Sequence, residues 1–142
     1  LGPIGEAAQL VEAALQARTA ASQGQKFATT KTLFFALSGL SRALRLELRL
    51  RDIGQEKPPS ELRADCEVCA STLHDVLSDK KLEMTAPFCR SVGECFRQVF
   101  ALCESLNAVG VVLDVHKLLE NRKTSAEAKV AALDALGEIS KA

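Results

Sequence analysis

Leu44-Arg45-Leu46-Glu47-Leu48-Arg49-Leu50-Arg51 is the stretch of this 142-residue chain that separates a purely helical fold from a mixed one. Its strict alternation of apolar and charged residues is typical of a half-buried β-strand. Leu, Arg and Glu are nevertheless good helix formers, and the run contains no β-branched or aromatic residue. No other stretch offers a strand to pair with it, and a lone strand leaves its backbone groups without hydrogen bonds. We therefore predict a helix here, with leucines on more than one side because it packs against two neighbours.

The helical period extends upstream from this stretch. Apolar residues recur every three or four positions and predict one long helix over 25–52. Its buried face is expected to hold Phe27, Leu33, Phe34, Leu37, Leu40, Leu44 and Leu48. A first helix is expected over 6–22 before the break at Gly24. Its apolar face is expected to hold Leu10, Val11, Ala14 and Leu15.

Downstream, Gly54, Pro58 and Pro59 mark residues 53–60 as an internal linker. A third helix is predicted from an N-cap at Ser60 to residue 78, and a fourth, with Pro87 in its first turn, from about 85 to 107. Fifth and sixth helices are predicted over 108–120 and from 124 onward, the last opened by a capping box. The fold class predicted is all-α, with three antiparallel helix pairs in one domain over 1–142. Because the chain begins at Leu1 rather than at Met, we expect it to be a fragment of a longer protein.

The predicted last helix carries the sequence Glu127-Ala128-Lys129-Val130-Ala131-Ala132-Leu133-Asp134-Ala135-Leu136-Gly137-Glu138-Ile139. This resembles the second helix of a HEAT repeat, where a basic residue precedes small alanines, then Ala-Leu-Gly and an aliphatic residue. With the preceding helix, the resemblance covers residues 109–141, about one repeat. It implies a short HEAT- or armadillo-type α-solenoid of stacked helix pairs, whose alanines and Gly137 allow close packing. A closed helical bundle, as in cytoskeletal or adhesion rod modules, is the alternative fold.

The composition excludes several classes of function. Basic and acidic residues number 18 each, and the chain has no Trp and no Tyr, which disfavours nucleic-acid binding. No apolar run approaches the ~18 residues of a membrane span, so no membrane insertion is expected. The five cysteines are an odd number and lie within helical patterns. That usage favours a reducing compartment, and the predicted location is cytoplasmic.

The residues that most often carry chemistry are interpreted as structural. Cys66-x-x-Cys69 follows no strand and lies on the apolar face of its helix, unlike a redox motif, and no further ligands complete a zinc site. Cys89, Cys95 and Cys103 are assigned to the core for the same reason. His74 and His116 each stand alone among charged residues. No phosphate-binding loop or nucleophile motif is present. We expect no enzyme activity, no metal and no cofactor.

Charge segregation is the most informative feature of the chain. Residues 26–51 contain six basic residues and one acid, Glu47. Arg42, Arg45 and Arg49 are spaced three and four apart and form one ridge, which continues backward through Phe35. We predict that these four residues bind a protein partner of acidic character, the arginines by charge-assisted hydrogen bonds and Phe35 as an apolar anchor. The alternative is a solvated face offset by acids of the third helix, namely Glu61, Asp65, Glu67 and Asp75.

The function predicted is a non-catalytic scaffold or adaptor segment for protein–protein interaction. Three alternatives remain open. The first is a helical-bundle cytoskeletal or adhesion module. The second is a homo-oligomer formed through the terminal helix, whose apolar face reaches the chain end uncovered. The third is a helical enzyme or metal-binding module.

Overall fold

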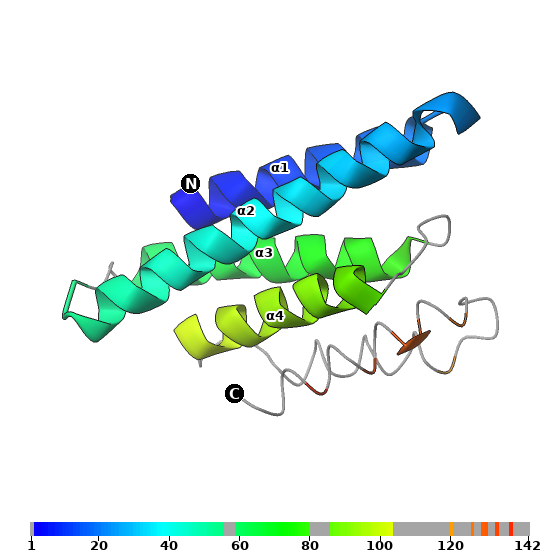
Figure 1. Cartoon of the computed structure of the whole chain (residues 1–142). Coiled ribbons are helices and arrows are strands. Elements are labelled where there is room, and N and C mark those ends of the chain that lie inside the picture. The colour runs from blue at the N-terminus through cyan, green and yellow to red at the C-terminus, as the bar shows by residue number, and fades with distance from the viewer. Residues whose placement is uncertain are drawn as a thin grey trace.

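The computed structural model describes residues 2–55, 59–79 and 86–103, together with isolated residues at 120, 126, 129, 130, 133 and 137. These residues form helices and contain no strand. The elements are α1 (Pro3–Ala20), the 3-10 turn η1 (Gln23–Gln25), α2 (Lys26–Asp52), α3 (Pro59–Ser78) and α4 (Ala86–Leu102), as Figure 1 shows. The alternating stretch 44–51 is helical throughout, which confirms the prediction. Most of the predicted fifth and sixth helices, and of the HEAT-like stretch 109–141, lies outside the described residues.

The predicted helix boundaries were wrong at several ends, among them the end of α1, which lies at Ala20 rather than at residue 22. α1 begins at Pro3, with Gly2 as its N-cap, because proline is well suited to the first position of a helix. α3 begins at Pro59, so Ser60 is not its N-cap and the last two residues of the predicted linker are helical. α4 ends at Leu102, five residues before the predicted end. Pro87 does lie in the first turn of α4, as expected.

Gly54 ends α2 through its backbone conformation. Its φ of 78° is a left-handed value that a residue with a Cβ adopts only at a cost. The Gly54 N–H donates to the Arg51 carbonyl oxygen at 3.0 Å, and the Gln55 N–H donates to that of Leu50 at 2.8 Å. This pair of bonds is the Schellman motif, which satisfies carbonyls that the helix end leaves free.

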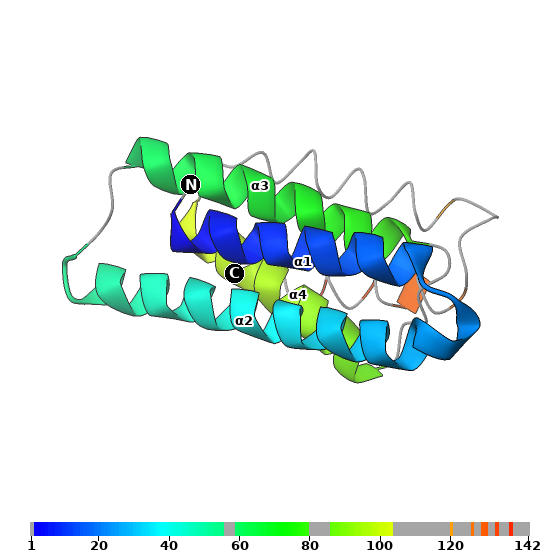
Figure 2. The same cartoon turned by 90° about the horizontal axis from the view of Figure 1, so that it is seen from above.

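The four helices pack as two stacked pairs. α1 is antiparallel to α2, and α3 is antiparallel to α4 (Figures 1 and 2). α1 also lies beside α3, and α2 beside α4. The Gly2 N–H donates to Asp65 Oδ1 at 3.3 Å near the N-terminal ends of α1 and α3, and Thr19 Oγ1 donates to Asp79 Oδ2 at 2.8 Å at their C-terminal ends. These two bonds hold α1 and α3 parallel and in register.

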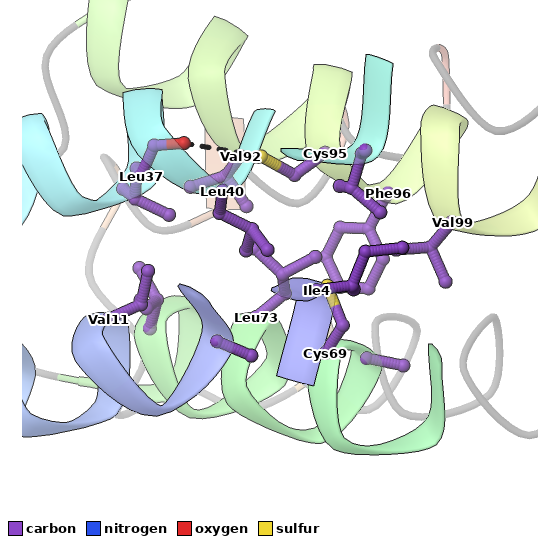
Figure 3. Close-up of a cluster of buried hydrophobic side chains, with 14 of the residues drawn as sticks. Ile4, Val11, Leu37, Leu40, Cys69, Leu73, Val92, Cys95, Phe96 and Val99 are labelled. Atoms are coloured by element: carbon purple, nitrogen blue, oxygen red, sulfur yellow. Dashed lines mark hydrogen bonds between the residues drawn. The ribbon is translucent and has the colours of Figure 1, made fainter. Parts of the chain in front are cut away.

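Apolar side chains from all four helices meet in one core (Figure 3). Leu37 and Leu40 of α2 face Leu73 of α3 and Phe96 of α4, and each of these side chains is fully buried. Two residues assigned to buried faces lie outside this core. Leu10 is 66% exposed and Phe27 is 82% exposed, because each lies on the side of its helix that no described element covers.

The alternating leucines of α2 divide between core and solvent. Leu44 is fully buried, and Leu48 packs partly against the core. α2 contacts both α1 and α4, which agrees with the prediction of two neighbours. Leu46 does not follow the prediction, because it is 57% exposed. Helical period explains this, since position 46 lies about half a turn from position 44.

Candidate protein-binding surface

The face of α2 opposite the core carries the four residues predicted to bind a partner. Arg42, Arg45 and Arg49 are exposed, and Phe35 is 61% exposed. The spacing of three, four and seven residues aligns them along one side of the helix. The fully buried leucines at 33, 37, 40 and 44 fix this orientation, because they hold the other side of α2 against the core.

α4 converts this exposed face into one wall of a groove. A hollow of about 500 Å³ opens between α2 and α4 and is lined by Ser38, Ser41, Arg42, Arg45, Arg90, Ser91 and Glu94. A second hollow, of about 300 Å³, is lined by Arg42, Arg45, Leu46 and Arg49. Arg42 and Arg45 line both, so the two hollows form one continuous surface, which we call the arginine groove.

The cations of the arginine groove are available to a ligand. Within the described part of the chain, Arg42, Arg45, Arg49 and Arg90 make no hydrogen bond and no ion pair. Among the described residues that line the groove, Glu94 is the one acid, and its carboxylate is already engaged. Arg97 Nε donates to Glu94 Oε2 at 3.2 Å, and a second guanidinium nitrogen of Arg97 donates to Oε1. The groove therefore presents four guanidinium groups against one carboxylate that is held by Arg97.

A buried polar contact fixes the floor of the groove. Ser41 Oγ donates to Gln98 Oε1 at 3.2 Å across the α2–α4 contact. Gln98, which is fully buried, donates through Nε2 to Glu94 Oε1 at 3.3 Å. Buried polar groups of this kind are costly to leave unpaired, so the contact favours one alignment of the two helices. The Gln98 bond is also a second contact, besides the Arg97 pair, that holds the Glu94 carboxylate.

Phe35 lies beyond the hollows, toward the N-terminal end of α2. The Lys31 ammonium lies 5.9 Å from the centroid of the Phe35 ring, within the range of a cation–π contact. The exposed ring is thus flanked by a positive charge and followed along the helix by the arginines. The prediction that an aromatic residue stands in line with the arginine ridge is confirmed in its geometry.

The acids of α3 do not line the arginine groove, whose described lining comes from α2 and α4. Glu67 pairs with Arg63 of its own helix at 3.1 Å, and Asp65 accepts from the Gly2 N–H. Asp75 faces Glu12 of α1, where burial and then the neighbouring Asp75 raise the pKa of Glu12. The alternative in which α3 offsets the ridge through these acids gains no support from the contacts.

The cysteines lie in the core. Cys66, Cys69, Cys95 and Cys103 are buried free thiols, as predicted. Burial raises the pKa of Cys66 and of Cys95 to about 12 and raises that of Cys69 well above 9.0. Such thiols are poor nucleophiles, because the thiolate is the reactive form. Among the described residues no three side chains of His, Cys, Asp or Glu gather as metal ligands. His74 is half-buried, while His116 and the side chain of Cys89 lie outside the described part.

The α4 wall of the groove was not predicted from the sequence. Arg90, Ser91 and Glu94 belong to α4, and nothing local in the sequence indicates that this side of α4 meets α2. Leu46 was missed because the alternating run suggested that every leucine in it packs inward. The sequence could have predicted the exposure of Leu46, since position 46 falls beside Arg42, Arg45 and Arg49 on a helical projection.

Comparison with known proteins returned no relative: no family model, no curated protein and no solved structure matches this chain. Among the described helices, none combines the length and the apolar character that crossing a membrane requires. Gly137 is a described residue of the HEAT-like stretch, and the resemblance implies close packing there. A Cβ built there would meet no atom within 4 Å, so no close packing is found at this glycine among the described residues.

Proposed function

We propose that this chain is a non-catalytic, protein-binding segment of a HEAT-like α-solenoid, and that it binds an acidic protein segment in the arginine groove. The observation that carries the function is the groove itself, where four arginines without an ion pair in the described residues face solvent beside one carboxylate that is already paired.

The helix contacts support the solenoid part of the proposal. In an up-down-up-down bundle each helix packs against the next along the chain, so α2 would contact α3 and α4 would contact α1. In a solenoid, stacked pairs place first helices beside first helices and second beside second. The main contacts here are α1 with α3 and α2 with α4, besides the two within pairs, and these contacts support the solenoid proposal.

Arginine chemistry supports the acidic partner. A guanidinium group forms bidentate hydrogen bonds with a carboxylate, and such charge-assisted bonds are roughly twice as strong as neutral ones. Phe35 and Leu46 add exposed apolar area beside the charges, a composition found at the centres of protein interfaces. The free buried thiols suit a reducing compartment, so we place the protein in the cytoplasm.

The test is binding of an acidic peptide to two charge-matched variants. Arg42→Gln/Arg45→Gln/Arg49→Gln removes three positive charges from the groove. Gln9→Glu/Ala13→Glu/Gln16→Glu adds three negative charges at exposed positions of α1, giving the same change in net charge elsewhere. Both must match the wild-type chain in helicity and in urea midpoint. We expect the groove variant to bind a Glu-rich peptide at least ~10-fold more weakly and the α1 variant to bind normally. Equal losses in both variants would reduce the effect to net charge and defeat the proposal.

One observation favours homo-oligomerisation as a second candidate. Val130 and Leu133 are helical and more than half exposed, at 53% and 56%. If this face joins two copies, the sedimentation mass rises with concentration, and Val130→Asp/Leu133→Asp restores the monomer. A mass that stays monomeric at high concentration excludes it.

A further inference from the structure

The larger hollow of the arginine groove has the chemistry of a phosphate site. Three arginines, Arg42, Arg45 and Arg90, line one space of about 500 Å³ between α2 and α4. We propose that this hollow receives the phosphoryl group of a phosphorylated serine or threonine within the acidic segment. The inference rests on the proposed function and specifies its ligand.

Charge matching separates a phosphoryl group from a carboxylate. A carboxylate carries one negative charge and two oxygens, and one bidentate arginine satisfies it. A phosphoserine carries about −1.5 to −2 charges and three terminal oxygens, which match the three arginines that line one hollow. Glu94 does not neutralise them, because Arg97 and Gln98 hold its carboxylate.

The identity of the cations points the same way. Every described basic residue that lines the groove is Arg, and Lys31, which is exposed on the same helix, contacts Phe35 instead. A surface that only attracts acids works with lysine as well, whereas the planar fork of arginine matches phosphate oxygens in pairs.

Of the three serine hydroxyl groups in the described lining of the larger hollow, two donate hydrogen bonds within the protein and one can donate to a ligand. Ser38 Oγ donates to the Phe34 carbonyl oxygen at 3.1 Å, and Ser41 Oγ donates to Gln98. Ser91 makes no hydrogen bond within the described part of the chain and lines the same hollow as Arg90. Its hydroxyl can donate to a phosphoryl oxygen.

The helix rise predicts the spacing of the ligand. Phe35 lies about 13 Å along α2 from the midpoint of Arg42 and Arg45, and Arg49 lies about 8 Å from it on the other side, at 1.5 Å per residue. An extended ligand covers ~3.3 Å per residue. It would therefore place an apolar residue about four positions from the phosphorylated one, against Phe35. An acidic residue two or three positions to the other side would reach Arg49.

A protein segment fits this surface better than a membrane does. Arg42, Arg45 and Arg90 line a hollow between α2 and α4, while the described lining of the smaller hollow belongs to α2. A narrow chain can enter such a groove, whereas lipid headgroups in a bilayer surface meet a protein over a broad front. Phe35 lies beyond the hollows and Leu46 lines the smaller one, so these two exposed apolar residues stand apart along α2.

The experiment uses fluorescent peptides with Leu, phosphoserine and Glu at this spacing, written in both chain directions. Each is made in three forms, with phosphoserine, serine or glutamate at the central position. Binding is followed by anisotropy at 0.15 M salt to the full chain, to Arg90→Gln, which alters the larger hollow alone, and to Arg49→Gln, which alters the smaller one alone.

We expect the phosphorylated form, in one of the two directions, to bind at least ~10-fold more tightly than the serine and glutamate forms. Arg90→Gln should lower the affinity of the phosphorylated form far more than that of the serine form, while Arg49→Gln should lower both by similar factors. Phosphoserine and glutamate forms that bind equally would overturn the phosphate site and leave the acidic-segment proposal intact. Tighter binding to phosphoinositide vesicles than to any peptide would also overturn it. If no form binds, the proposed function itself fails.

Discussion

At Cys95 the thiol donates a hydrogen bond to the Leu37 carbonyl oxygen across the α2–α4 contact, with 3.7 Å between the sulfur and the oxygen (Figure 3). Cys69 lies nearby on α3 and is also fully buried. Burial is the largest cause of the raised pKa at Cys66, Cys69 and Cys95, because a thiolate loses its hydration there. These residues act as small apolar side chains of the core. The Cys-x-x-Cys spacing of Cys66 and Cys69 is therefore explained by packing on one helix face.

The raised thiol pKa values predict a loss of stability in base. The unfolded chain releases these protons near pH 9, while the folded chain keeps those of Cys66 and Cys95 to about pH 12. The stabilisation is thus complete below pH 9 and is lost as the pH rises from 9 toward 12. The free energy of unfolding should fall by about 1 kcal/mol per thiol between pH 9 and 10. Urea unfolding from pH 7 to 10 measures it.

The chain has no Tyr, but its nine lysines are of a residue type that also titrates in this window, so the contribution of the thiols has to be isolated with a variant. Cys95→Ala provides the control. It should be less stable at pH 7 but should lose stability less steeply above pH 9 than the wild-type chain. A free energy that stays flat to pH 10 in the wild-type chain would show that water reaches these thiols.

At the scale of one element, α2 has a buried side and an exposed side that carry different residues. Its leucines at 33, 37, 40 and 44 enter the core, and the opposite side carries Phe35 and the arginines. Arg51 differs from these arginines although it lies in the same alternating run. Its side chain is half-buried, and a guanidinium nitrogen donates to the Ala101 carbonyl oxygen in the last turn of α4. A positive charge at a helix C-terminus also interacts favourably with the negative end of the helix dipole.

Arg51 is therefore expected to stabilise the fold, and Arg49 is not. Arg51→Ala should lower the free energy of unfolding by about 1–2 kcal/mol, since it removes a charge-assisted bond to a helix end. Arg49→Ala removes an exposed side chain and should change it by less than about 0.5 kcal/mol. Urea unfolding of the two variants compares them directly. Equal effects would mean that the Arg51 contact contributes nothing to stability.

At the scale of the whole molecule, α1 and α3 are parallel neighbours, which the proposed stacking of helix pairs requires and an up-down-up-down bundle does not. Thr19 and Asp79 join the C-terminal ends of these two helices. In the bundle, α1 and α3 would lie diagonally across the core and their ends would not meet.

Cross-linking tests this arrangement in solution. Thr19→Cys/Asp79→Cys should be joined by a short bis-maleimide in high yield, because the two side chains are in hydrogen-bond contact in the wild-type chain. Thr19→Cys/Arg90→Cys pairs α1 with α4, which is not among its main contacts, and should react poorly. Peptide mapping identifies the bridge, and the buried native thiols should react little. Similar yields from both pairs would contradict the stacking.

Helical period and residue preferences were sufficient for the all-helical class, the extent of α2 and the exposed line from Phe35 to Arg49. They gave these because each is a property of one segment and of its own apolar face. They failed at Leu10 and Phe27, where an apolar residue lies on a face that no described element covers.

The rest depended on which helices meet. Periodicity states that a helix has a buried side but not which neighbour covers it, so the contacts of α1 with α3 and of α2 with α4 could not be read from local pattern. The contribution of α4 to the arginine groove, through Arg90, Ser91 and Glu94, follows from that packing. So does the pairing of Glu94 with Arg97, which leaves the arginines of α2 facing solvent. The line of positive charge on α2 could be predicted from the sequence, because it depends on residue spacing within one helix. The larger hollow, with Arg42 and Arg45 on one side and Arg90 on the other, exists only because α2 and α4, which are distant in the chain, lie side by side.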